Sequence, residues 1–520
     1  MADWQHYLFE FLTILHIVLV LVLVAHILVK QKNYGVAIAW IATLALMPFL
    51  GVVLYLIFGQ VYVSQKYSKR HHIARQLLAD LAHNAKITLH SDDSLQHLSK
   101  KWRALAAMGE TQTGFGAQAN HQATLLANAD AIFDALISDI HRATRTVMME
   151  FYIVHPQGKT LEVLEALIAA KHRGVRCILL ADSVGSAAFF RSNIYKKLLA
   201  EDISVTPMLP VGLFKTIIAR ADIRNHRKLI YIDETIAYTG SFNLVDPRFF
   251  KQNSGIGQWI DVMIRTTHHD HMGVVKAIGA VIASDLGTEQ ADGLSMLKTT
   301  IQKYTKKLPT PKKGLTNTAQ NIEQSPMFDY PMVDNVIMQL LPSAPRLSGT
   351  LVYDTIITAL YHARREVIIT TPYFVPDEPL MLALTNAVQR GVSVTLIIPQ
   401  KSDSTLVKYA SQAYFLALLQ AGVRIALYKD GLLHSKIIWI DNEYALFGTV
   451  NMDMRSFYIN MEVMLAIYRS NDGITMLDEL KDLQAHYLAE CQIITLADWQ
   501  NRKWYLSVLD GAVRLVSPLL

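Results

Sequence analysis

A short pattern of polar residues is written twice in this chain, once in each half. His226-x-Lys228 is followed by Asp233, and His434-x-Lys436 is followed by Asp441. A second match follows each copy at the same offset, Gly240-Ser241-x-Asn243 and Gly448-Thr449-x-Asn451. One such pattern arises by chance in long chains, whereas two copies with matching downstream residues indicate a duplicated unit. We therefore expect one site built from two halves, with paired His and Lys side chains suited to a phosphate.

The chain is long enough for two or three domains, and its composition predicts that one part lies in a membrane. Hydrophobic residues make up 51% of the 520 residues, which is high for a soluble enzyme. The net charge of +5 is too small to identify a partner. The two cysteines, Cys177 and Cys491, stand far apart in apolar surroundings. They predict neither a disulfide framework nor a cysteine-based zinc site.

Two apolar stretches near the N-terminus predict a transmembrane hairpin. Phe11–Val29 and Gly35–Phe58 contain no charged residue, and a short polar loop, residues 30–33, separates them. Each stretch is about long enough to cross roughly 30 Å of hydrocarbon as a helix. The alternative is a signal peptide followed by a core helix. Neither a basic segment nor a small-residue cleavage site precedes Phe11, so we favour the hairpin.

A hairpin places the N-terminus and the chain after Gln60 on the same side of the membrane. Basic residues are more numerous after the second stretch (Lys66, Lys69, Arg70, Arg75) than in the loop (Lys30, Lys32). The positive-inside rule therefore favours a cytoplasmic catalytic region in a bacterial inner membrane. The same basic residues would lie near anionic lipid headgroups, although a solvated helix face explains them equally well.

Each half repeats one order of predicted elements: helix, strand, helix, strand. They cover residues 131–144, 147–153, 160–173 and 175–180 in the first half. In the second half a helix ends near 363, and residues 367–371, 378–390 and 392–398 follow. Gly174 and Gly391 separate helix from strand, as a helix stop should. This alternation predicts an α/β fold with a mostly parallel sheet flanked by helices.

These elements set the expected domain boundaries. The hairpin occupies residues 1–60, a connecting segment 61–118, the first α/β domain 119–297, a Lys-rich linker 298–325 and the second domain 326–520. The linker carries Lys303, Lys306, Lys307, Lys312 and Lys313 among few large apolar residues. Such a run is typical of a solvated surface excursion.

Side chains alternate between the two faces of a β-strand, and this parity separates the His and Lys of each motif from its Asp. Residues two apart face the same side of a strand, so His226 points with Lys228, and His434 with Lys436. The motif aspartates lie seven residues after the histidines, about 23 Å along a straight strand. The motifs supply the candidate catalytic set His226, Lys228, Asp233, His434, Lys436 and Asp441. Within it, the parity assigns the two aspartates to structural support at the strand end.

A histidine that attacks or donates a proton needs an acceptor for its other ring nitrogen. Asp261 follows Trp259 in a predicted strand of the first half, and Glu462 opens a predicted strand of the second. We expect Asp261 to orient His226 and Glu462 to orient His434. The alternative is that both are ordinary carboxylates of edge strands.

Fixed charge and neutral donors in the motifs suit the oxygens of a phosphodiester. The lysines supply the charge, and the candidate phosphate-binding residues are Asn243, Asn451, Ser241 and Thr449. No metal or cofactor is expected. The string His268-His269-Asp270-His271 is more typical of a polar helix start than of a metal site. The chain has no Walker loop and no dinucleotide fingerprint.

These residues resemble the phospholipase D superfamily, and within it the bacterial cardiolipin synthases, along nearly the whole chain. Similar strings are Ala39-Trp40-Ile41, Phe58-Gly59, Asp182-Ser183-x-Gly185-Ser186, Phe189-Phe190-Arg191-Ser192, Asn225-His226-Arg227-Lys228, Pro372-Tyr373-Phe374-Val375-Pro376-Asp377, His434-Ser435-Lys436 and Ser517-Pro518-Leu519-Leu520. The resemblance implies two α/β halves about a pseudo-twofold axis. It also implies phosphatidyl transfer between two phosphatidylglycerols through a phosphatidyl-histidine, with His226 as nucleophile and His434 as acid and base.

Three other functions are weighed against this one. A membrane phospholipase D that uses water or another alcohol carries the same motifs. A nuclease of the superfamily would not need two membrane spans, so we expect no nucleic-acid partner. A lipid-binding scaffold with a dead site would have lost part of a motif, and both are intact. The expected partners are phosphatidylglycerol and anionic membrane lipids, and the sequence leaves the oligomeric state open.

Overall fold

The computed structural model describes residues 2–30, 34–59, 67–74, 76, 98–210, 223–268, 273–290, 295, 331–345, 349–470 and 473–516. Several predictions fall outside these residues. They concern the loop residues 31–33, Lys66, Arg75, residues 269–271 of the histidine-rich string, the linker 298–325 and the terminal residues 517–520.

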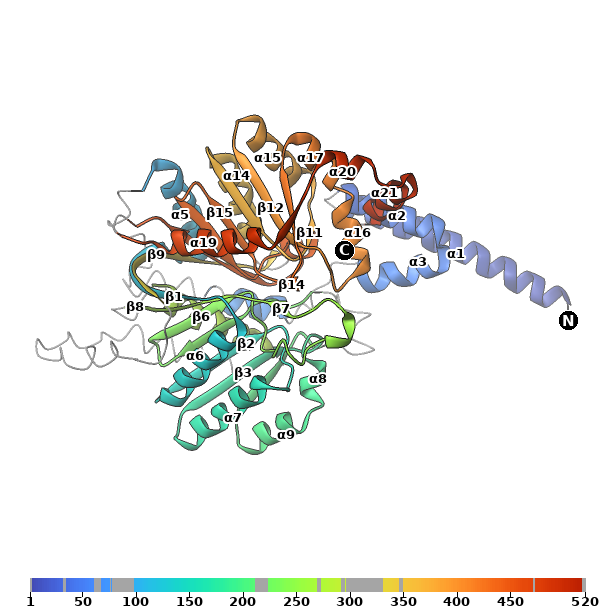
Figure 1. Ribbon diagram of the computed structural model, residues 1–520. Helices are drawn as coiled ribbons and strands as arrows, with labels where there is room; N and C mark the ends of the chain where they lie inside the picture. The colour runs from blue at the N-terminus through green and yellow to red at the C-terminus, as the bar shows by residue number, and fades with distance from the viewer. Residues whose placement is uncertain are drawn as a thin grey trace, which may run out of the picture.

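The strands of both halves form one sheet (Figure 1). The first half contributes β1 (Gln118–Leu126), β2 (Thr146–Phe151), β3 (Arg176–Asp182), β4 (Ser204–Met208), β5 (Leu229–Ile232), β6 (Ile236–Gly240) and β8 (Met263–His268). The second half contributes β9 (Met332–Ser343), β10 (Glu366–Thr370), β12 (Ser393–Pro399), β13 (Arg424–Tyr428), β15 (Ile437–Ile440), β16 (Tyr444–Gly448), β18 (Glu462–Tyr468) and, at its edge, β19 (Cys491–Ile494).

The strands of the two halves lie on either side of the central pair β1–β9. From this pair outward the order is β8-β6-β5-β2-β3-β4 on one side and β18-β16-β15-β10-β12-β13 on the other. Corresponding strands occupy corresponding places, which is the pseudo-twofold arrangement that a duplicated unit predicts. The α/β fold with two similar halves is thus confirmed.

The expectation of a mostly parallel sheet is wrong. Among the described strands of this sheet, parallel pairing is confined to β2–β3–β4 and β10–β12–β13, and the other neighbours run antiparallel. Part of the difference arises at the two motif strands, β5 and β15, each of which turns back through a tight hairpin. Both turns hold two residues with positive φ: Asp233 (54°) and Glu234 (67°), Asp441 (58°) and Asn442 (55°). Two such residues in succession favour a two-residue hairpin loop.

The predicted helices are found close to their expected limits and cover one face of the sheet. They are α6 (Ala129–Arg142), α7 (Lys159–His172), α14 (Leu351–His362) and α15 (Glu378–Gln389). Along β2, Val147, Met149 and Phe151 pack with α6 and α7, whereas Met148 packs on the opposite side with α11 (Gly273–Glu289). This alternation is the period of two of a strand buried on both faces. The helix α19 (Met476–Ala489) takes the place of α11 in the second half.

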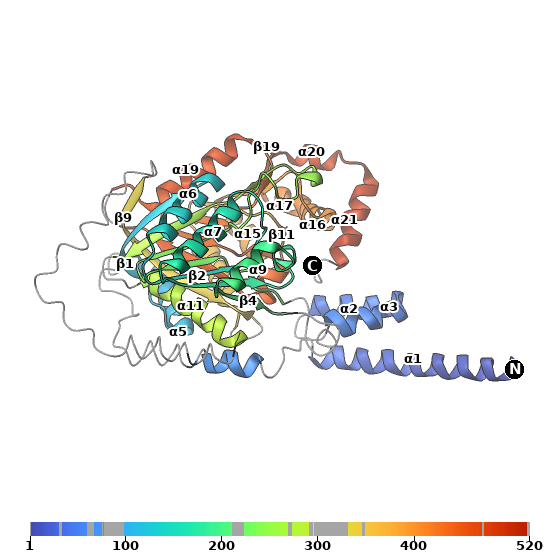
Figure 2. The ribbon, with the colours of Figure 1, turned by 90° about the horizontal axis from the view of Figure 1, so that it is seen from below.

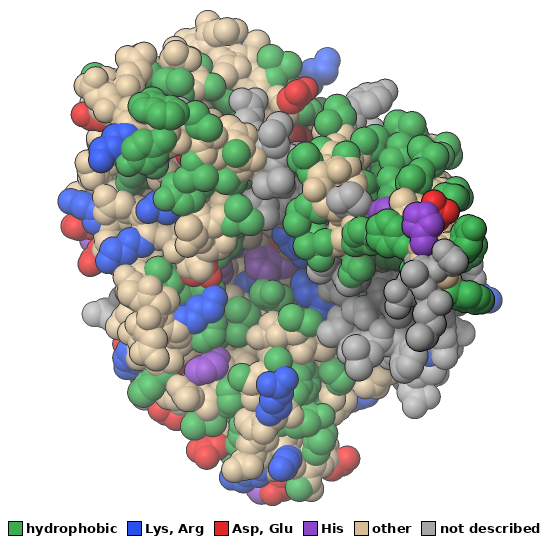
Figure 3. Space-filling model, turned by 90° about the vertical axis from the view of Figure 1, so that its right-hand side faces the viewer, with side chains coloured by type: hydrophobic (Ala, Val, Ile, Leu, Met, Phe, Trp, Pro, Cys, Tyr) green, Lys and Arg blue, Asp and Glu red, His purple; other side chains and the backbone are tan. Residues whose placement is uncertain are grey.

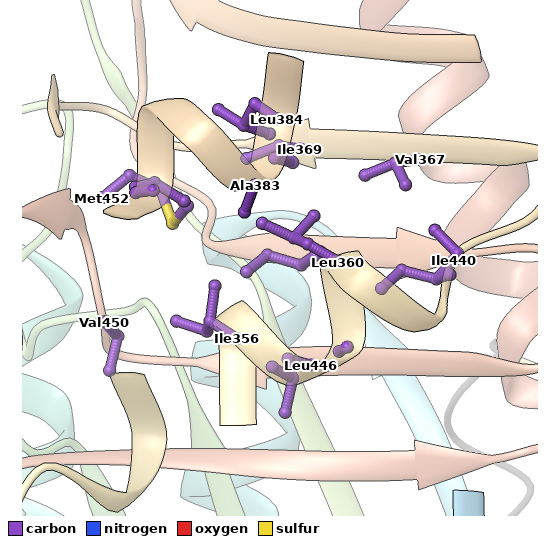
Figure 4. Close-up of a cluster of buried hydrophobic side chains, with 14 of the residues drawn as sticks. Ile356, Leu360, Val367, Ile369, Ala383, Leu384, Ile440, Leu446, Val450 and Met452 are labelled. Carbon is purple, nitrogen blue, oxygen red and sulfur yellow. The ribbon is translucent and has the colours of Figure 1, made fainter. Parts of the chain in front are cut away.

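The second half has the same layered core (Figure 4). Side chains of α14 and α15 meet those of β10, β15 and β16, and the contributors include Ile356, Leu360, Ala383, Leu384, Val367, Ile369, Ile440 and Leu446. Burial of these side chains removes them almost fully from water, which is the main favourable term in the folding of each half. The two cores therefore give the interface between the halves a rigid support.

Shorter elements complete the two halves. They are α5 (Lys100–Thr113), α8 (Ala187–Phe190), α9 (Asn193–Ala200), the 3-10 helix Gln252–Ser254, β7 (Trp259–Ile260), β11 (Phe374–Val375), α16 (Thr405–Gln412), α17 (Phe415–Ala421), β14 (Leu432–Leu433), β17 (Met452–Asp453), α18 (Met454–Tyr458), α20 (Leu496–Gln500) and α21 (Trp504–Val516). Two of them, β7 and β14, pair with each other beside His434.

The N-terminal region projects from the two halves as a helical cluster (Figure 2). Its first helix is α1 (Ala2–Lys30). Among the described residues, its segment His6–Lys30 is the one helical stretch long and apolar enough to cross a membrane. The second helix, α2 (Tyr34–Leu46), packs against α1 through residues that include Leu23, Ile27, Trp40 and Leu44. This pair forms a helical hairpin.

The sequence predicts one continuous helix for the second apolar stretch. The structure instead divides this stretch at Met47. There α3 (Pro48–Leu54) begins with a proline, which has no N–H to continue the preceding helix, and a π-helical turn (Tyr55–Gly59) follows it. The new helix packs closely against α2, because a Cβ on Gly51 would lie 2.7 Å from the carbonyl oxygen of Thr43. Glycine at this position permits the close approach.

Candidate active site

Each motif histidine lies where the two halves exchange backbone hydrogen bonds. The strand β14, just before His434, pairs in parallel with β7 of the first half, and the His434 N–H donates to Ile260 O at 2.9 Å. The His226 N–H donates to Met461 O of the second half, also at 2.9 Å. Each histidine is therefore held beside the residue that follows its backbone partner in the other half.

The residues that follow Ile260 and Met461 are the two predicted carboxylates, Asp261 and Glu462. His226 Nδ1 lies 3.0 Å from Glu462 Oε2, and His434 Nδ1 lies 2.7 Å from Asp261 Oδ1. The expected residues are present, but the expected pairing is wrong: each histidine takes its carboxylate from the opposite half. The physical reason is the backbone exchange between the halves, which brings β7 to His434 and the start of β18 to His226. Because Nδ1 of each ring is engaged, Nε2 is left to react.

The motif hydroxyls bind these carboxylates. Ser241 Oγ donates to Asp261 Oδ1 at 2.6 Å, and Thr449 Oγ1 donates to Glu462 Oε2 at 2.6 Å. The hydroxyl oxygens also accept backbone N–H groups: Ser241 Oγ accepts that of Val262, and Thr449 Oγ1 accepts that of Val463. This differs from the expectation that the hydroxyls bind phosphate, since their donors and acceptors are already engaged. They hold the carboxylates in place, as partners of a catalytic carboxylate commonly do.

The two lysines are fully buried beside the histidines. Lys228 Nζ donates to His226 O, and Lys436 Nζ donates to His434 O. Burial lowers the pKa of Lys228 to about 8, and burial lowers the pKa of Lys436 well below its usual value. Each lysine also disfavours the charged form of the histidine across the interface. The four side chains thus form one electrostatic unit.

Burial also keeps the two imidazoles neutral. It lowers the pKa of His226 to about 4 although Glu462 favours the charged ring, and it lowers the pKa of His434 to about 4 although Asp261 does the same. Burial opposes the charged form of Asp261, but His434, Lys436 and the Ser241 hydroxyl together outweigh it, so the pKa of this carboxyl stays below its usual value. The ring pKa values make stability fall as the pH drops from 6.5 to about 4, because the unfolded histidines bind protons there first.

The motif aspartates lie at the far end of the motif strands. The carboxylate of Asp233 accepts the backbone N–H groups of Thr144, Arg145 and Thr146 at 2.7–2.8 Å. Asp441 accepts those of residues 364–366 at 2.8–2.9 Å. Both therefore fasten the hairpin turn to the start of the neighbouring strand, β2 or β10, in line with the structural role that their parity predicts.

Asp233→Ala is expected to destabilise the first half by about 2 kcal/mol, because three backbone donors lose their acceptor. The midpoint of thermal inactivation should fall by roughly 4–8 °C. Asp233→Asn is the matched control, since asparagine also tolerates the positive φ and keeps one acceptor oxygen. Turnover at low temperature that drops with the alanine variant while its midpoint stays unchanged would contradict this role.

The two asparagines of the motifs are buried near the carboxylates. Asn243 Oδ1 accepts the Ile153 N–H at 3.1 Å, which leaves its amide group as a donor. The side-chain oxygen of Asn451 has no hydrogen-bond partner among the described residues. Their expected binding of phosphate remains a prediction.

A buried charged cluster beneath His226 was missed from the sequence. Arg227 forms an ion pair with Asp285 and donates from Nε to the carbonyl oxygen of Glu462 at 3.1 Å. Asn225 Nδ2 donates to Glu150 Oε1 at 2.7 Å. The acid Glu150 in the otherwise apolar strand Val147–Phe151 was the available signal. The cluster supports the backbone that carries Glu462.

A loss of activity above about pH 8 is expected from the pKa of Lys228. Below this pH the ammonium is charged, and we expect it to bind a phosphodiester. Above it the charge is lost, so kcat/KM should fall about tenfold per pH unit. Lys228→Arg should be slower at its optimum but should keep its charge, which moves the fall to higher pH. A wild-type profile that stays level to pH 10 would contradict the assignment.

A hollow lies between the two halves on the side from which α1 projects. A space-filling view of this side shows histidine and Lys or Arg side chains at the bottom of a hollow between the two halves (Figure 3). A substrate that enters through this hollow approaches from the end of the molecule that carries the apolar helices.

Comparisons with known proteins agree with this geometry. The family model described as "Cardiolipin synthase, PLD-like domain" matches residues 136–267 and 356–484, and one described as "Phospholipase_D-nuclease N-terminal" matches residues 18–60. The chain is 35% identical over 498 residues to cardiolipin synthase A of Serratia proteamaculans and of Pectobacterium carotovorum, with 95% of each chain covered. A phosphatidylserine synthase from Haemophilus influenzae has a similar fold, with a TM-score of 0.55 and 14% identity over 81% of this chain and 100% of that one.

Proposed function

This chain belongs to the cardiolipin synthase family of phospholipase D-like phosphatidyltransferases, and from that premise we propose its reaction. It transfers a phosphatidyl group from one phosphatidylglycerol to a second, which gives cardiolipin and glycerol. The observation that carries the proposal is the pair of buried histidines, each with a carboxylate from the opposite half on Nδ1. Two such rings can share a nucleophilic and an acid–base role on one phosphorus.

In the first step, His226 Nε2 attacks the phosphorus of the donor lipid. The bond from phosphorus to the glycerol oxygen breaks as the phosphorus–nitrogen bond forms, and His434 gives its Nε2 proton to the leaving glycerol. Glu462 stabilises the positive charge that develops on His226. Lys228 and Lys436 supply positive charge for the phosphate oxygens, which gather negative charge in transfer, and Asn243 and Asn451 supply neutral contacts.

In the second step, His434 Nε2 takes the proton of a headgroup hydroxyl on a second phosphatidylglycerol. The oxygen attacks phosphorus, the phosphorus–nitrogen bond breaks, and His226 leaves as a neutral ring. A phosphodiester bound between the lysines adds negative charge beside the rings, which favours the protonated state that His434 needs. Neither step requires a metal or another cofactor.

The location of the site suits this chemistry. We propose that the helical hairpin holds the chain in the bacterial inner membrane as a multi-pass protein, with the catalytic region in the cytoplasm. The hollow lies on the same side as α1, so both lipids could reach it with their acyl chains still in the bilayer. Lys69, which follows the hairpin and is exposed, would lie near anionic headgroups, whereas the Arg70 guanidinium donates to the backbone oxygens of Thr288 and Glu289 at the end of α11.

Purified protein incubated with phosphatidylglycerol in vesicles tests the proposal. We expect cardiolipin and glycerol in equal amounts, and neither product from His226→Ala. Phosphatidic acid as the main product would show that water is the acceptor and would make the protein a hydrolase.

A further inference from the structure

A polar cluster outside the motifs lies beside His434. The Trp259 ring packs against His434 with 4.5 Å between ring centroids, and Lys251 Nζ lies 5.3 Å from the Trp259 ring centroid. Lys251 forms an ion pair with Asp403 at 3.0 Å, and Tyr373 OH donates to the other oxygen of Asp403 at 2.7 Å. The contacts therefore run without a break from His434 to Asp403.

This cluster joins the two halves beside His434. Lys251 belongs to the first half and Asp403 to the second, and their loops also meet where Lys401 Nζ donates to Gly255 O. The side chain of Lys251 is 45% exposed and that of Asp403 is 12% exposed. An ion pair as exposed as this adds little to stability. The Lys251 ammonium is instead accessible to a polar ligand, and the partly exposed Asp403 carboxylate lies beside it.

Charge at this position is found only on the His434 side. Asp403 lies four residues after the end of β12. Ser186 lies four residues after the end of the corresponding strand, β3. The Ser186 hydroxyl donates to Tyr152 O and accepts the Val154 N–H, so it is used within the fold. The duplicated halves thus differ where a ligand beside one histidine would be bound.

We propose that Asp403, with Lys251 and Tyr373, binds the glycerol headgroup of phosphatidylglycerol and sets the preference for this alcohol. The inference rests on the proposed function, in which His226 is bonded to phosphorus and the alcohol lies on the His434 side. The leaving glycerol and the attacking headgroup occupy that same position in turn. While one headgroup hydroxyl gives its proton to His434, the remaining hydroxyl can donate to the Asp403 carboxylate, which a simple alcohol has no second hydroxyl to do.

A competition between two acceptors tests the proposal. Phosphatidyl-p-nitrophenol serves as the donor, because its leaving group needs no glycerol site, and phosphatidylglycerol and ethanol are supplied together. The ratio of cardiolipin to phosphatidylethanol is independent of the amount of folded enzyme. In Asp403→Asn we expect this ratio to fall about tenfold or more, because the amide donates where the carboxylate accepted. Lys251→Gln should lower it in the same direction.

Asp482→Asn, an exposed change on α19, is the matched control and should keep the wild-type ratio. An unchanged ratio in Asp403→Asn would overturn the inference. Loss of both products together in the Asp403 and Lys251 variants would overturn it as well, since the cluster would then act on phosphatidyl transfer itself. Wild-type protein that makes no cardiolipin from phosphatidylglycerol would instead contradict the proposed function, before either variant is considered.

Discussion

His434→Ala is expected to trap the phosphatidyl group on His226 when the donor is phosphatidyl-p-nitrophenol. Nitrophenolate leaves without a proton, so His226 can still attack, but no base remains to activate the acceptor. We expect a burst of about one nitrophenol per site, followed by turnover reduced roughly 10³-fold or more. Mass spectrometry of the digested protein should find the phosphatidyl group on the peptide that contains His226.

His226→Ala is the companion variant and should show neither the burst nor turnover. With phosphatidylglycerol as donor, both variants should be inactive, since glycerol leaves only as it is protonated. A phosphatidyl group on the His434 peptide of the His226 variant would reverse the two roles.

Glu462→Gln and Asp261→Asn are expected to fail at different steps, because each carboxylate serves the histidine of the opposite half. In Glu462→Gln the new amide donates to Nδ1, which places the ring proton of His226 on Nε2, the atom that must attack. The nitrophenol burst should then slow by about a hundredfold or more. The change lies in the second half, yet it should resemble the loss of His226.

Asp261→Asn should keep the burst and lose the turnover that follows it. The neutral His434 ring then carries its proton on Nε2 and cannot accept another from the incoming hydroxyl. The rate after the burst should fall by about a hundredfold or more. Both phenotypes are read from one stopped-flow trace per variant. An exchange of the two phenotypes would show that each carboxylate serves its own half in solution.

Local patterns in the sequence predicted most of the secondary structure and the candidate residues. The helices α6, α7 and α15 follow from apolar periodicity and from glycine stops, which act within a few residues. Strand parity separated the motif aspartates from the histidines, and Asp233 does fasten a strand end. These inferences needed no knowledge of which segments meet.

The pairing of the carboxylates could not be derived in this way. Asp261 is 173 residues from His434, and Glu462 is 236 residues from His226. Both pairings place a carboxylate in a strand after a motif, and only the backbone exchange at Ile260 and Met461 decides between them. The hydroxyls of Ser241 and Thr449 were misassigned for the same reason, because their partners follow from the position of those strands.

Two other differences had a signal that was not used. The turn residues after Ile232 and Ile440 indicated tight hairpins, and a hairpin makes its strands antiparallel. Pro48 lies in the middle of the second apolar stretch, where a proline ends or kinks a helix. The turn residues thus indicate the antiparallel pairs β5–β6 and β15–β16, and Pro48 indicates the divided helix.

The crossed carboxylates also determine when the protein becomes active during its synthesis. The ribosome completes His226 and Lys228 long before Glu462, which lies in a late strand of the second half. A chain that ends before Glu462 thus has an intact first motif and still lacks the carboxylate partner of His226. The pair of histidine–carboxylate contacts is therefore complete only after nearly the whole chain has been translated and folded.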